Sequence, residues 1–498
     1  MGENTFLVLP VLMPVLAGGL LLAVQKHLRS RRALLGYFLT FLILHGGLTI
    51  LLGIWCLTEG EYRYLQLWQL MDGVSIALHT DRLSLLFALF MAAVWTLAGI
   101  FAVGYMRKEE REGTFYAWYL MAGGVLTGLD LSANMVTLYL FYEMMSLSTL
   151  PLVLHTLKKE AIMAGLKYLF YSAGGAFAGL FGIIYLFGKG ILCDFSPDRT
   201  QNIQAAAQSD PVFYVVIFLM ILGFGVKAGM FPFHGWLPTA HPVAPAPASA
   251  VLSGVITKAG VLAIVRLIYF VVGAEVIKGT WVQYAWLILA LITVFMGSMM
   301  AYREPLMKKR FAYSTVSQLA YIMAGLSLLN FYGLAGALSH VVFHSLIKNA
   351  LFAVAGAIIC QTGKTKVSEL RGIGKEMPVT IWCFTLAALG LIGIPPFAGF
   401  ISKWYLAAGA LQAEIGVLRW IAPAVLLLSA LLTAGYLLPI TIHGFLPGKA
   451  YDYGSLKKRE PSLWMVLPIV ILTAGIAYFG IWPGGLMELL TAIGKSIL

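Results

Sequence analysis

Residues 223–238 read GFGVKAGMFPFHGWLP, a segment that is apolar but too rich in glycine and proline to form one continuous helix. Proline lacks a backbone donor and clashes with the preceding turn, so this helix should break near Pro232. Residues 393–400, GIPPFAGF, fit the same template, Gly-x-x-Pro-Phe-x-Gly-aromatic. Freed backbone groups at membrane depth are tolerated only where protein or a water-filled cavity satisfies them. The two segments therefore predict paired broken helices in a membrane protein.

The composition of the whole chain supports a membrane location. Of 498 residues, 60% are hydrophobic and 11% are charged, whereas about 25% are charged in an ordinary soluble domain. Apolar stretches long enough to cross a bilayer recur along the chain, and they predict an all-α polytopic membrane protein of about 14 transmembrane helices. The expected spans are residues 6–25, 34–57, 83–105, 114–132, 133–155, 162–188, 211–240, 245–272, 283–302, 311–330, 332–360, 379–411, 419–446 and 462–484.

The basic residues indicate which side of the membrane each loop occupies. They gather in alternate loops, for example at residues 107–111, 303–310 and 364–375. Short cytoplasmic loops carry the excess of Lys and Arg, so these loops should be cytoplasmic and both termini should lie on the outer side. The net charge of +12 is therefore a topology signal and does not indicate a nucleic-acid partner. We expect an integral protein of a prokaryotic cytoplasmic membrane.

The four cysteines, Cys56, Cys193, Cys360 and Cys383, show no CxxC spacing and no clustering with histidine. Neither an iron-sulfur cluster nor a zinc site is indicated. A haem-attachment motif and a Gly-rich dinucleotide turn are missing from the sequence as well. We therefore expect no cofactor and no metal site in this chain.

Several ionisable residues fall at membrane depth, where they are costly and are functional by default. Among the acids, Glu143 lies near the middle of a span and Asp130 at the outer end of one. Snorkelling to the interface is an alternative that fits Lys167 and Arg266 best, because both lie close to a plausible helix end. The basic residues at membrane depth are Lys167, Lys227, Lys258, Arg266, Lys348 and Lys403.

His340, His344 and Lys348 recur at four-residue spacing, so they should line one face of a helix. Desolvation makes a buried lysine release its proton more readily, and a nearby carboxylate opposes this effect. Glu143 is the carboxylate placed to do so. A lone buried histidine is more often a packing residue, but three titratable groups in register predict a polar path through the membrane.

The two broken spans are expected to be the seventh and the twelfth. They are five spans apart, an odd number, so a five-helix repeat would have opposite orientations in its two copies. The alternative is two independent kinks. On the repeat interpretation the chain divides into N-terminal helices (1–113), a first repeat (114–272), an inverted second repeat (283–446) and a C-terminal loop and helix (447–498).

Further segments combine with these residues into a specific pattern. They are residues 81–87 (DRLSLLF), 140–143 (LFYE), 232–238 (PFHGWLP), 240–245 (AHPVAP), 249–253 (SAVLS), 258–260 (KAG), 308–314 (KKRFAYS) and 395–400 with Lys403. In this pattern the chain resembles the antiporter-like membrane subunits of respiratory complex I and the large subunits of Mrp-type Na⁺/H⁺ antiporters, a family shared with membrane-bound hydrogenases. Lysine at position 403 looks more like the Mrp D-type and several complex I-like subunits.

The resemblance implies fourteen helices, two inverted repeats, a Glu143–Lys227 pair, a connecting Lys258 and an exit-side Lys403. It also implies a proton-translocating subunit, with Na⁺ transport left open, that works beside other antiporter-like and small membrane subunits and in some complexes beside a redox arm. Two alternatives remain open. One is a quinone-binding redox subunit, and the other is a secondary carrier of a small organic substrate, for which broken helices are equally natural.

Overall fold

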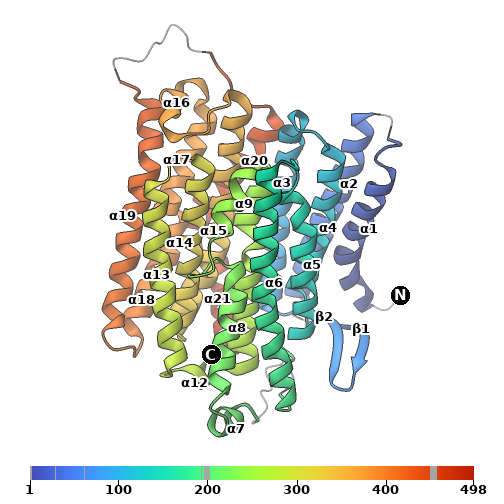
Figure 1. The fold of residues 1–498 in the computed structure, drawn as a ribbon, viewed down its shortest axis with the longest axis vertical. Coiled ribbons are helices and arrows are strands. Elements are labelled where there is room, and N and C mark those ends of the chain that lie inside the picture. Colours follow the sequence, from blue (N-terminus) through green and yellow to red (C-terminus); the bar gives the residue numbers. More distant parts are fainter. Residues whose placement is uncertain (1–2, 29, 61, 192, 196–201, 449–456) are drawn as a thin grey trace.

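The computed structural model describes residues 3–28, 30–60, 62–191, 193–195, 202–448 and 457–498. Long helices run side by side in one bundle (Figure 1). Both chain ends lie toward the same end of the bundle, together with α7 and α12, whereas α16 lies at the opposite end (Figure 1). Most of the C-terminal loop expected between residues 447 and 461 lies outside the described residues.

The long helices are α1 (Leu9–Val24), α2 (Arg31–Glu59), α3 (Arg82–Tyr105), α4 (Glu112–Asp130), α5 (Met135–Val153), α6 (Lys159–Gly188), α8 (Phe213–Lys227), α13 (Trp281–Arg303), α14 (Met307–Ser327), α15 (Phe331–Thr362), α17 (Pro378–Ile392), α18 (Ala398–Gln412), α19 (Leu418–Phe445), α20 (Leu463–Ile481) and α21 (Gly484–Ile497). The shorter helices are α7 (Asn202–Ser209), α9 (Leu237–Val243), α10 (Ala246–Val251), α11 (Lys258–Val265), α12 (Ala274–Ile277) and α16 (Ile373–Glu376). Single turns of 3₁₀-helix cover Met106–Lys108 and Val367–Leu370, and a longer one covers Glu3–Val8.

Among the described residues, 10 helices are long and apolar enough to cross a membrane, or up to 11 if the bent pair α7 and α8 counts as one span. The chain is therefore a mostly helical polytopic membrane protein. The expected count is higher because it includes α4 and α14, which fall outside these 10, and two spans that the structure divides into shorter pieces.

Both expected breaks are present. Helix α8 ends at Lys227, and Gly229 follows with a φ of +70°, which glycine adopts readily because it lacks a Cβ atom. The first break therefore begins a turn earlier than Pro232. Helix α17 ends at Ile392, and Gly393, at the corresponding template position, has a φ of +91°. The Phe231–Pro232 and Pro395–Pro396 peptide bonds are both cis.

The expected span 245–272 is a helix of mixed type. It begins as α10, passes through a π-helical turn at Leu252–Ile256, continues as α11 and ends in a second π-helical stretch at Arg266–Val272. π-Turns occur frequently at functional sites. Lys258 begins α11 two residues after the end of the first π-turn, and Arg266 begins the second.

Two elements were not expected from the sequence. Strands β1 (Tyr64–Met71) and β2 (Val74–His79) form an antiparallel hairpin, so the all-α prediction is wrong for this segment. The Asp72-Gly73 turn between them is a strong hairpin signal. The amphipathic helix α21 follows α20 and packs against α15 and α3.

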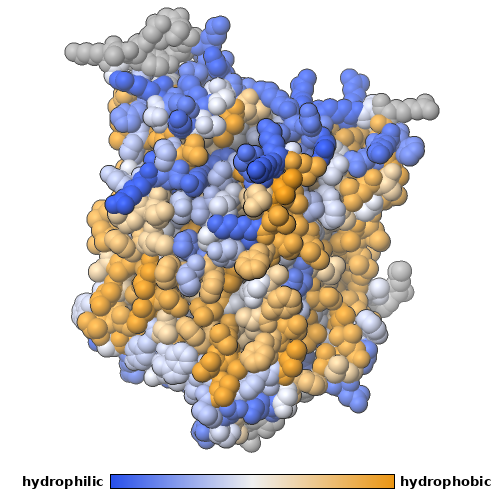
Figure 2. Space-filling view, in the orientation of Figure 1, coloured by the Kyte–Doolittle hydropathy of each residue, from blue (hydrophilic) through white to orange (hydrophobic). Residues whose placement is uncertain are grey.

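The bundle has an apolar outer surface and a centre made of two spans. Apolar residues cover much of the visible face, and polar ones gather near its ends, most densely at the α16 end (Figure 2). The span Ala246–Val272 and helix α15 are the most enclosed of the candidate spans, since 94% of an apolar 18-residue stretch of each is buried. Lys258 and the histidine series therefore lie at the centre of the protein.

Candidate functional site

Lys227 joins the first broken helix to α5. Its side chain is fully buried, and Nζ donates to the Ser146 hydroxyl at 2.6 Å and to the Tyr142 carbonyl at 3.3 Å. The ammonium also lies 4.2 Å from the centre of the Tyr142 ring, whose π face attracts cations. The break after Lys227 thus places its amine against a hydroxyl, a carbonyl and an aromatic ring of one neighbouring helix.

Glu143 follows Tyr142 on α5, in the middle of that helix, and it is half-buried. The expected Glu143–Lys227 pair is not a direct ion pair, because no nitrogen-to-oxygen contact within 4.0 Å joins these two described residues. The nearby side chains Leu140, Met144 and Leu147 are exposed. Glu143 therefore lies beside Lys227 but toward the surface of the bundle.

Lys258 connects the centre of the first half of the chain to the second. Its Nζ donates to the Ser253 carbonyl at 2.6 Å and lies 2.7 Å from Nδ1 of His344 on α15. An ammonium has no acceptor, so Nδ1 accepts this hydrogen bond while Lys258 is charged, and the imidazole proton is then on Nε2. The structure brings these two predicted residues into direct contact.

Helix α15 presents its three titratable residues on one buried face, as the spacing predicts. The rings of His340 and His344 have centroids 5.9 Å apart. Lys348 Nζ donates to the Ser314 hydroxyl at 2.7 Å, and that hydroxyl also accepts from Tyr436 at 2.7 Å. The hydroxyl groups of Ser314 on α14 and Tyr436 on α19 therefore extend the row of titratable side chains on α15, which we call the histidine series.

Lys403 lies in α18, after the second break, and reaches back across it. Its Nζ donates to the Leu391 carbonyl at 2.6 Å and to the Ile392 carbonyl at 2.8 Å, the last carbonyls of α17. A cation at a helix C-terminus interacts favourably with the helix dipole. The preceding residue, Ser402, lies 2.9 Å through its hydroxyl from Nδ1 of His340. The broken helix thus meets the histidine series directly.

Gln318 is a central residue that the sequence did not single out. On α14, Ser314 contacts Lys348 and Tyr321 stacks on His340. Gln318 lies between them on the same helical face, at the level of His344. It is fully buried, yet neither of its amide atoms has a partner among the described residues, and the same holds for Nε2 of His340 and of His344. The spacing Ser314, Gln318, Tyr321 (i, i+4, i+7) is the signal that could have identified it.

Such buried polar atoms need hydrogen-bond partners, and water is the partner small enough to reach several of them at once. Gln318 offers two donors and an acceptor, while each imidazole offers a donor or an acceptor at Nε2. The centre of the bundle therefore combines direct contacts between ionisable groups with polar atoms that can order water.

The Arg266 side chain does not reach solvent at the membrane interface, as snorkelling would require, but is buried inside the protein. Its side chain is only 1% exposed and forms a bidentate pair with Asp81, with N–O distances of 2.5 and 2.9 Å. The guanidinium also lies 4.6 and 4.4 Å from the ring centres of Phe195 and Phe270. The snorkelling interpretation of Arg266 is wrong, since its charge is neutralised inside the protein.

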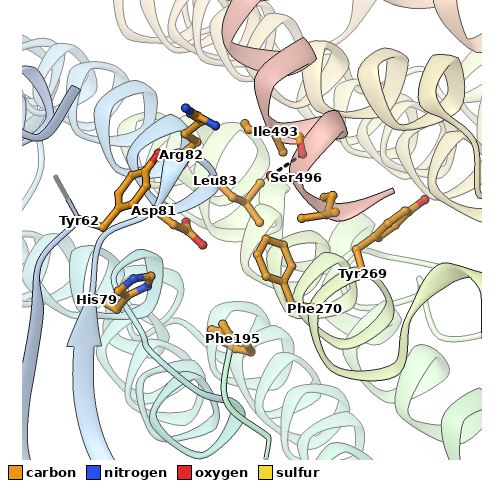
Figure 3. Close-up of a pocket in the computed structure, with 11 residues that line it drawn as sticks. Tyr62, His79, Asp81, Arg82, Leu83, Phe195, Tyr269, Phe270, Ile493 and Ser496 are labelled. Carbon is orange, nitrogen blue, oxygen red and sulfur yellow. Dashed lines mark hydrogen bonds between the residues drawn. The ribbon is translucent and has the colours of Figure 1, made fainter. Parts of the chain in front are cut away.

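Asp81 also lines a cavity of about 180 Å³ near the chain ends of the bundle. Tyr62, His79 and Arg82 lie beside Asp81, while Phe270 and residues of α21 lie opposite (Figure 3). Burial alone would raise the pKa of the Asp81 carboxyl, but the Arg266 charge and hydrogen bonds outweigh it and lower the pKa to about 2. The Arg266–Asp81 pair is therefore a structural connection between α3 and the span 246–272.

Comparison with known proteins identifies the family. Residues 132–438 match the family described as NADH:quinone oxidoreductase/Mrp antiporter, TM, and residues 69–116 match the NADH-ubiquinone oxidoreductase (complex I), chain 5 N-terminus. The chain is 33% identical over 411 residues to NADH-quinone oxidoreductase subunit N of Desulforudis audaxviator, covering 80% of each chain. The chain belongs to this antiporter-like subunit family.

One further sequence relative and one solved structure are also similar to this chain. Na⁺/H⁺ antiporter subunit A1 of Staphylococcus aureus is 30% identical over 444 residues, which cover 84% of this chain but only 54% of that protein. The chain thus spans about half the length of this longer relative. A chain in the structure of the Mrp complex from Dietzia sp. DQ12-45-1b superposes with a TM-score of 0.86 at 23% identity, covering 100% of this chain and 98% of that one. The predicted family is confirmed, and the fold is that of an antiporter-like subunit.

Proposed function

We propose that this antiporter-like subunit moves protons across the membrane along Glu143, Lys227, Lys258, His344, His340 and Lys403, with Lys348 beside the series. The observation that carries the proposal is the 2.7 Å contact between Lys258 and His344, which joins ionisable groups of the two most enclosed spans. Charged groups at this depth are expensive and are retained for ion or proton pathways.

The first step of the path runs between two helices that pack closely. A Cβ atom added to Gly260 of α11 would lie 3.3 Å from the Lys227 Cβ and 2.5 Å from the Phe224 carbonyl. Glycine at this position lets α11 approach α8. The close approach of α11, which begins with Lys258, to α8, which ends with Lys227, supports this step of the path. On this proposal Lys258 takes the proton from the side of Lys227 and passes it on to His344.

The chemistry of the groups favours protons over Na⁺. Amines and imidazoles bind protons, whereas hard cations such as Na⁺ require oxygen ligands. The central series offers mostly nitrogen atoms: Lys258, His344, His340 and Lys403. We therefore assign this path to H⁺, and any Na⁺ movement in the assembly requires a separate route lined by oxygen atoms.

We also propose that the chain crosses the membrane fourteen times, as two inverted five-helix repeats with both termini on the outer side. Support comes from α4 and α14, which pack against long apolar helices of the bundle, and from α8–α9 and α17–α18, which make two crossings in pieces. The positive φ values of Gly229 and Gly393 at equivalent template positions support a shared origin of the two breaks. The repeats correspond to residues 114–272 and 283–446.

The partners proposed for this subunit are other antiporter-like and small membrane subunits, as in Mrp-type or complex I-like assemblies, together with membrane lipid. The half-buried Glu143 supports this, because a carboxylate at mid-helix on an apolar surface requires a covering partner. An ion gradient or a redox arm of the assembly would then drive the proton movement.

Substitution of Glu143 and Lys227 tests the proposal. Glu143→Gln removes the charge but keeps the volume, and Lys227→Met removes the titratable amine, so each should abolish most proton flux in the reconstituted complex without impairing assembly. Glu59→Gln, an exposed change at the end of α2, is the matched control and should leave flux unchanged. Near-normal flux in both path variants would refute the proposed path.

A further inference from the structure

A second site lies away from the central path, at the end of the bundle opposite the chain termini. It is a cavity of about 190 Å³. We call it the basic cavity; its polar and aromatic lining includes Arg31, Arg107, Lys108, Gln361, Ser462 and Trp464.

The basic cavity lies at the level where membrane spans begin and end. The spans Arg31–Glu59 and Leu463–Ile481 begin at it, and the spans Arg82–Lys108 and Phe331–Thr362 end at it. Four span ends at one site place it at the boundary between the hydrocarbon core and the lipid headgroups. Trp464, which is 49% exposed there, is of the type enriched at membrane interfaces.

The charge of the basic cavity is positive. Arg31 is paired with Glu112 at 2.6 Å, so its charge is offset. Lys108 donates to the Cys360 carbonyl and keeps two further donors, and Arg107 is exposed. Among the described residues, no carboxylate lies within 4.0 Å of the charged nitrogen atoms of Arg107 or Lys108. Two uncompensated cations therefore face the cavity.

Backbone groups add to this attraction for an anion. Helix α20 begins at Leu463, beside the cavity, and the hydroxyl of its N-cap residue Ser462 makes no capping bond. The Met465 amide donates to the Ser462 carbonyl at 2.8 Å, which leaves the amides of Leu463 and Trp464 without a backbone acceptor among the described residues. A helix N-terminus with such amides favours a negative ligand. The cavity combines this N-terminus with two cations, Arg107 and Lys108, that have no carboxylate partner among the described residues.

An apolar surface continues from the basic cavity into the membrane. The α3 side chains Ala93, Leu97 and Ile100, one turn apart below Gly104, are half-buried, and Leu463 and Leu467 of α20 are 80% and 54% exposed. Gly104 itself packs against Ser462 and Met465 of α20. A ligand in the cavity can therefore extend hydrocarbon chains along α3 and α20.

We propose that the basic cavity binds the phosphate of an anionic phospholipid, whose acyl chains lie along α3 and α20. Basic pockets between transmembrane helices on the cytoplasmic side bind anionic headgroups. The apolar surface below the cavity distinguishes a lipid from free phosphate, which would gain nothing from it. This inference does not depend on the proton path.

The test uses the full chain in a zwitterionic detergent, with dioctanoyl phosphatidylglycerol as the probe. Native mass spectrometry and thermal stability should show binding of this lipid in preference to dioctanoyl phosphatidylcholine or inorganic phosphate. Arg107→Gln should weaken binding about fivefold, and Arg107→Gln with Lys108→Gln more strongly, since each basic residue near a surface contributes about 1 kcal/mol. Arg107 is exposed, so its single variant should fold normally.

Lys158→Gln with Lys159→Gln, an exposed pair at the start of α6, is the matched control and should bind the lipid normally. Equal binding of phosphatidylcholine would show that apolar burial alone holds the lipid. An equal response to inorganic phosphate would identify a free-anion site. Equal losses in the control variant would show a general effect of surface charge. Each of these results would overturn the proposal.

Discussion

Lys258 Nζ lies 2.7 Å from His344 Nδ1, although 86 residues separate the two along the chain. Both side chains are buried, and each belongs to one of the two spans at the centre of the bundle. Charge placed on either residue therefore acts directly on the other in a region of low dielectric. This contact connects the span Ala246–Val272 to α15, whose His340 contacts Ser402 of the second broken helix.

Replacing His344 tests whether this contact conducts. Phenylalanine keeps a ring but removes both nitrogens, so His344→Phe should lower proton flux at least tenfold while folding changes little. His344→Gln still donates and accepts hydrogen bonds and should retain more flux. Thermal stability and flux per folded complex are measured on both variants.

The matched control is His45→Phe, because His45 is buried on α2 and contacts Thr127 of α4 at 2.9 Å, and neither helix carries a residue of the proposed path. This variant should lose stability but keep its flux. A destabilised His344→Phe protein with normal flux per folded complex would show that His344 only packs.

Gln318 gives a prediction that separates activity from stability. Its amide has no protein partner among the described residues, so Gln318→Leu breaks no hydrogen bond within the protein and should change stability little. It should nevertheless lower flux, because leucine cannot order water between His340 and His344. Gln283→Leu should lower stability and leave flux unchanged, because Gln283 donates to the Ser327 carbonyl and accepts from the Gly279 amide. Unchanged flux in Gln318→Leu would remove this residue from the path.

Substitutions of Lys403 separate two properties of its side chain, the positive charge and the ability to release a proton. Lys403→Arg can still donate to the Leu391 and Ile392 carbonyls, but a guanidinium does not release its proton in proteins. We expect near-normal stability with flux reduced at least tenfold. Lys403→Glu should retain part of the flux because glutamate titrates, whereas Lys403→Ala should retain none. Full flux in Lys403→Arg would exclude proton exchange at this position.

Arg266→Ala should affect stability more than transport. Removing one partner of a buried ion pair typically costs about 3–5 kcal/mol, here because Asp81 loses its countercharge. Flux per folded complex should stay close to normal. Lys167→Ala is the control, since Lys167 is half-buried and has no carboxylate within 4.0 Å among the described residues. Lost flux at unchanged stability would place Arg266 in the path.

The same pair predicts how stability depends on pH. The folded pKa of Asp81 is about 2, below the unfolded value of about 3.9, so the ionised form is the one that folding favours. Its contribution, about 2 to 3 kcal/mol, is complete above about pH 5 and is lost as the pH falls toward 2. Asp81→Asn should make the thermal unfolding temperature depend less on pH below about pH 5. An unchanged pH dependence would contradict this role of Asp81.

The sequence located the two broken helices because glycine and proline act locally. Gly229 and Gly393 adopt positive φ values at matching template positions, and a helix ends just before each. The four-residue spacing of His340, His344 and Lys348 likewise placed them on one face. These features depend on neighbours within a few residues, which a sequence displays directly.

Other features depend on contacts that are distant in sequence. Arg266 looked like an interfacial residue until the fold placed Asp81 beside it, 185 residues away. Gln318 is ordinary in sequence and becomes notable only because the surrounding helices leave its amide without a partner. The Asp72-Gly73 hairpin was recognisable from its turn, but the dominant helical pattern obscured it.

The hydrogen bonds from Lys403 have a consequence for how the subunit responds to its neighbours. The side chain that we assign to proton exchange also holds the last carbonyls of α17 across the break from α18. A charged amine binds these carbonyls more strongly than a neutral one. Proton affinity and the relative position of the two helices are then thermodynamically linked, and such linkage is reciprocal. A partner that shifts α18 would change proton occupancy, and protonation would in turn exert force on the partner.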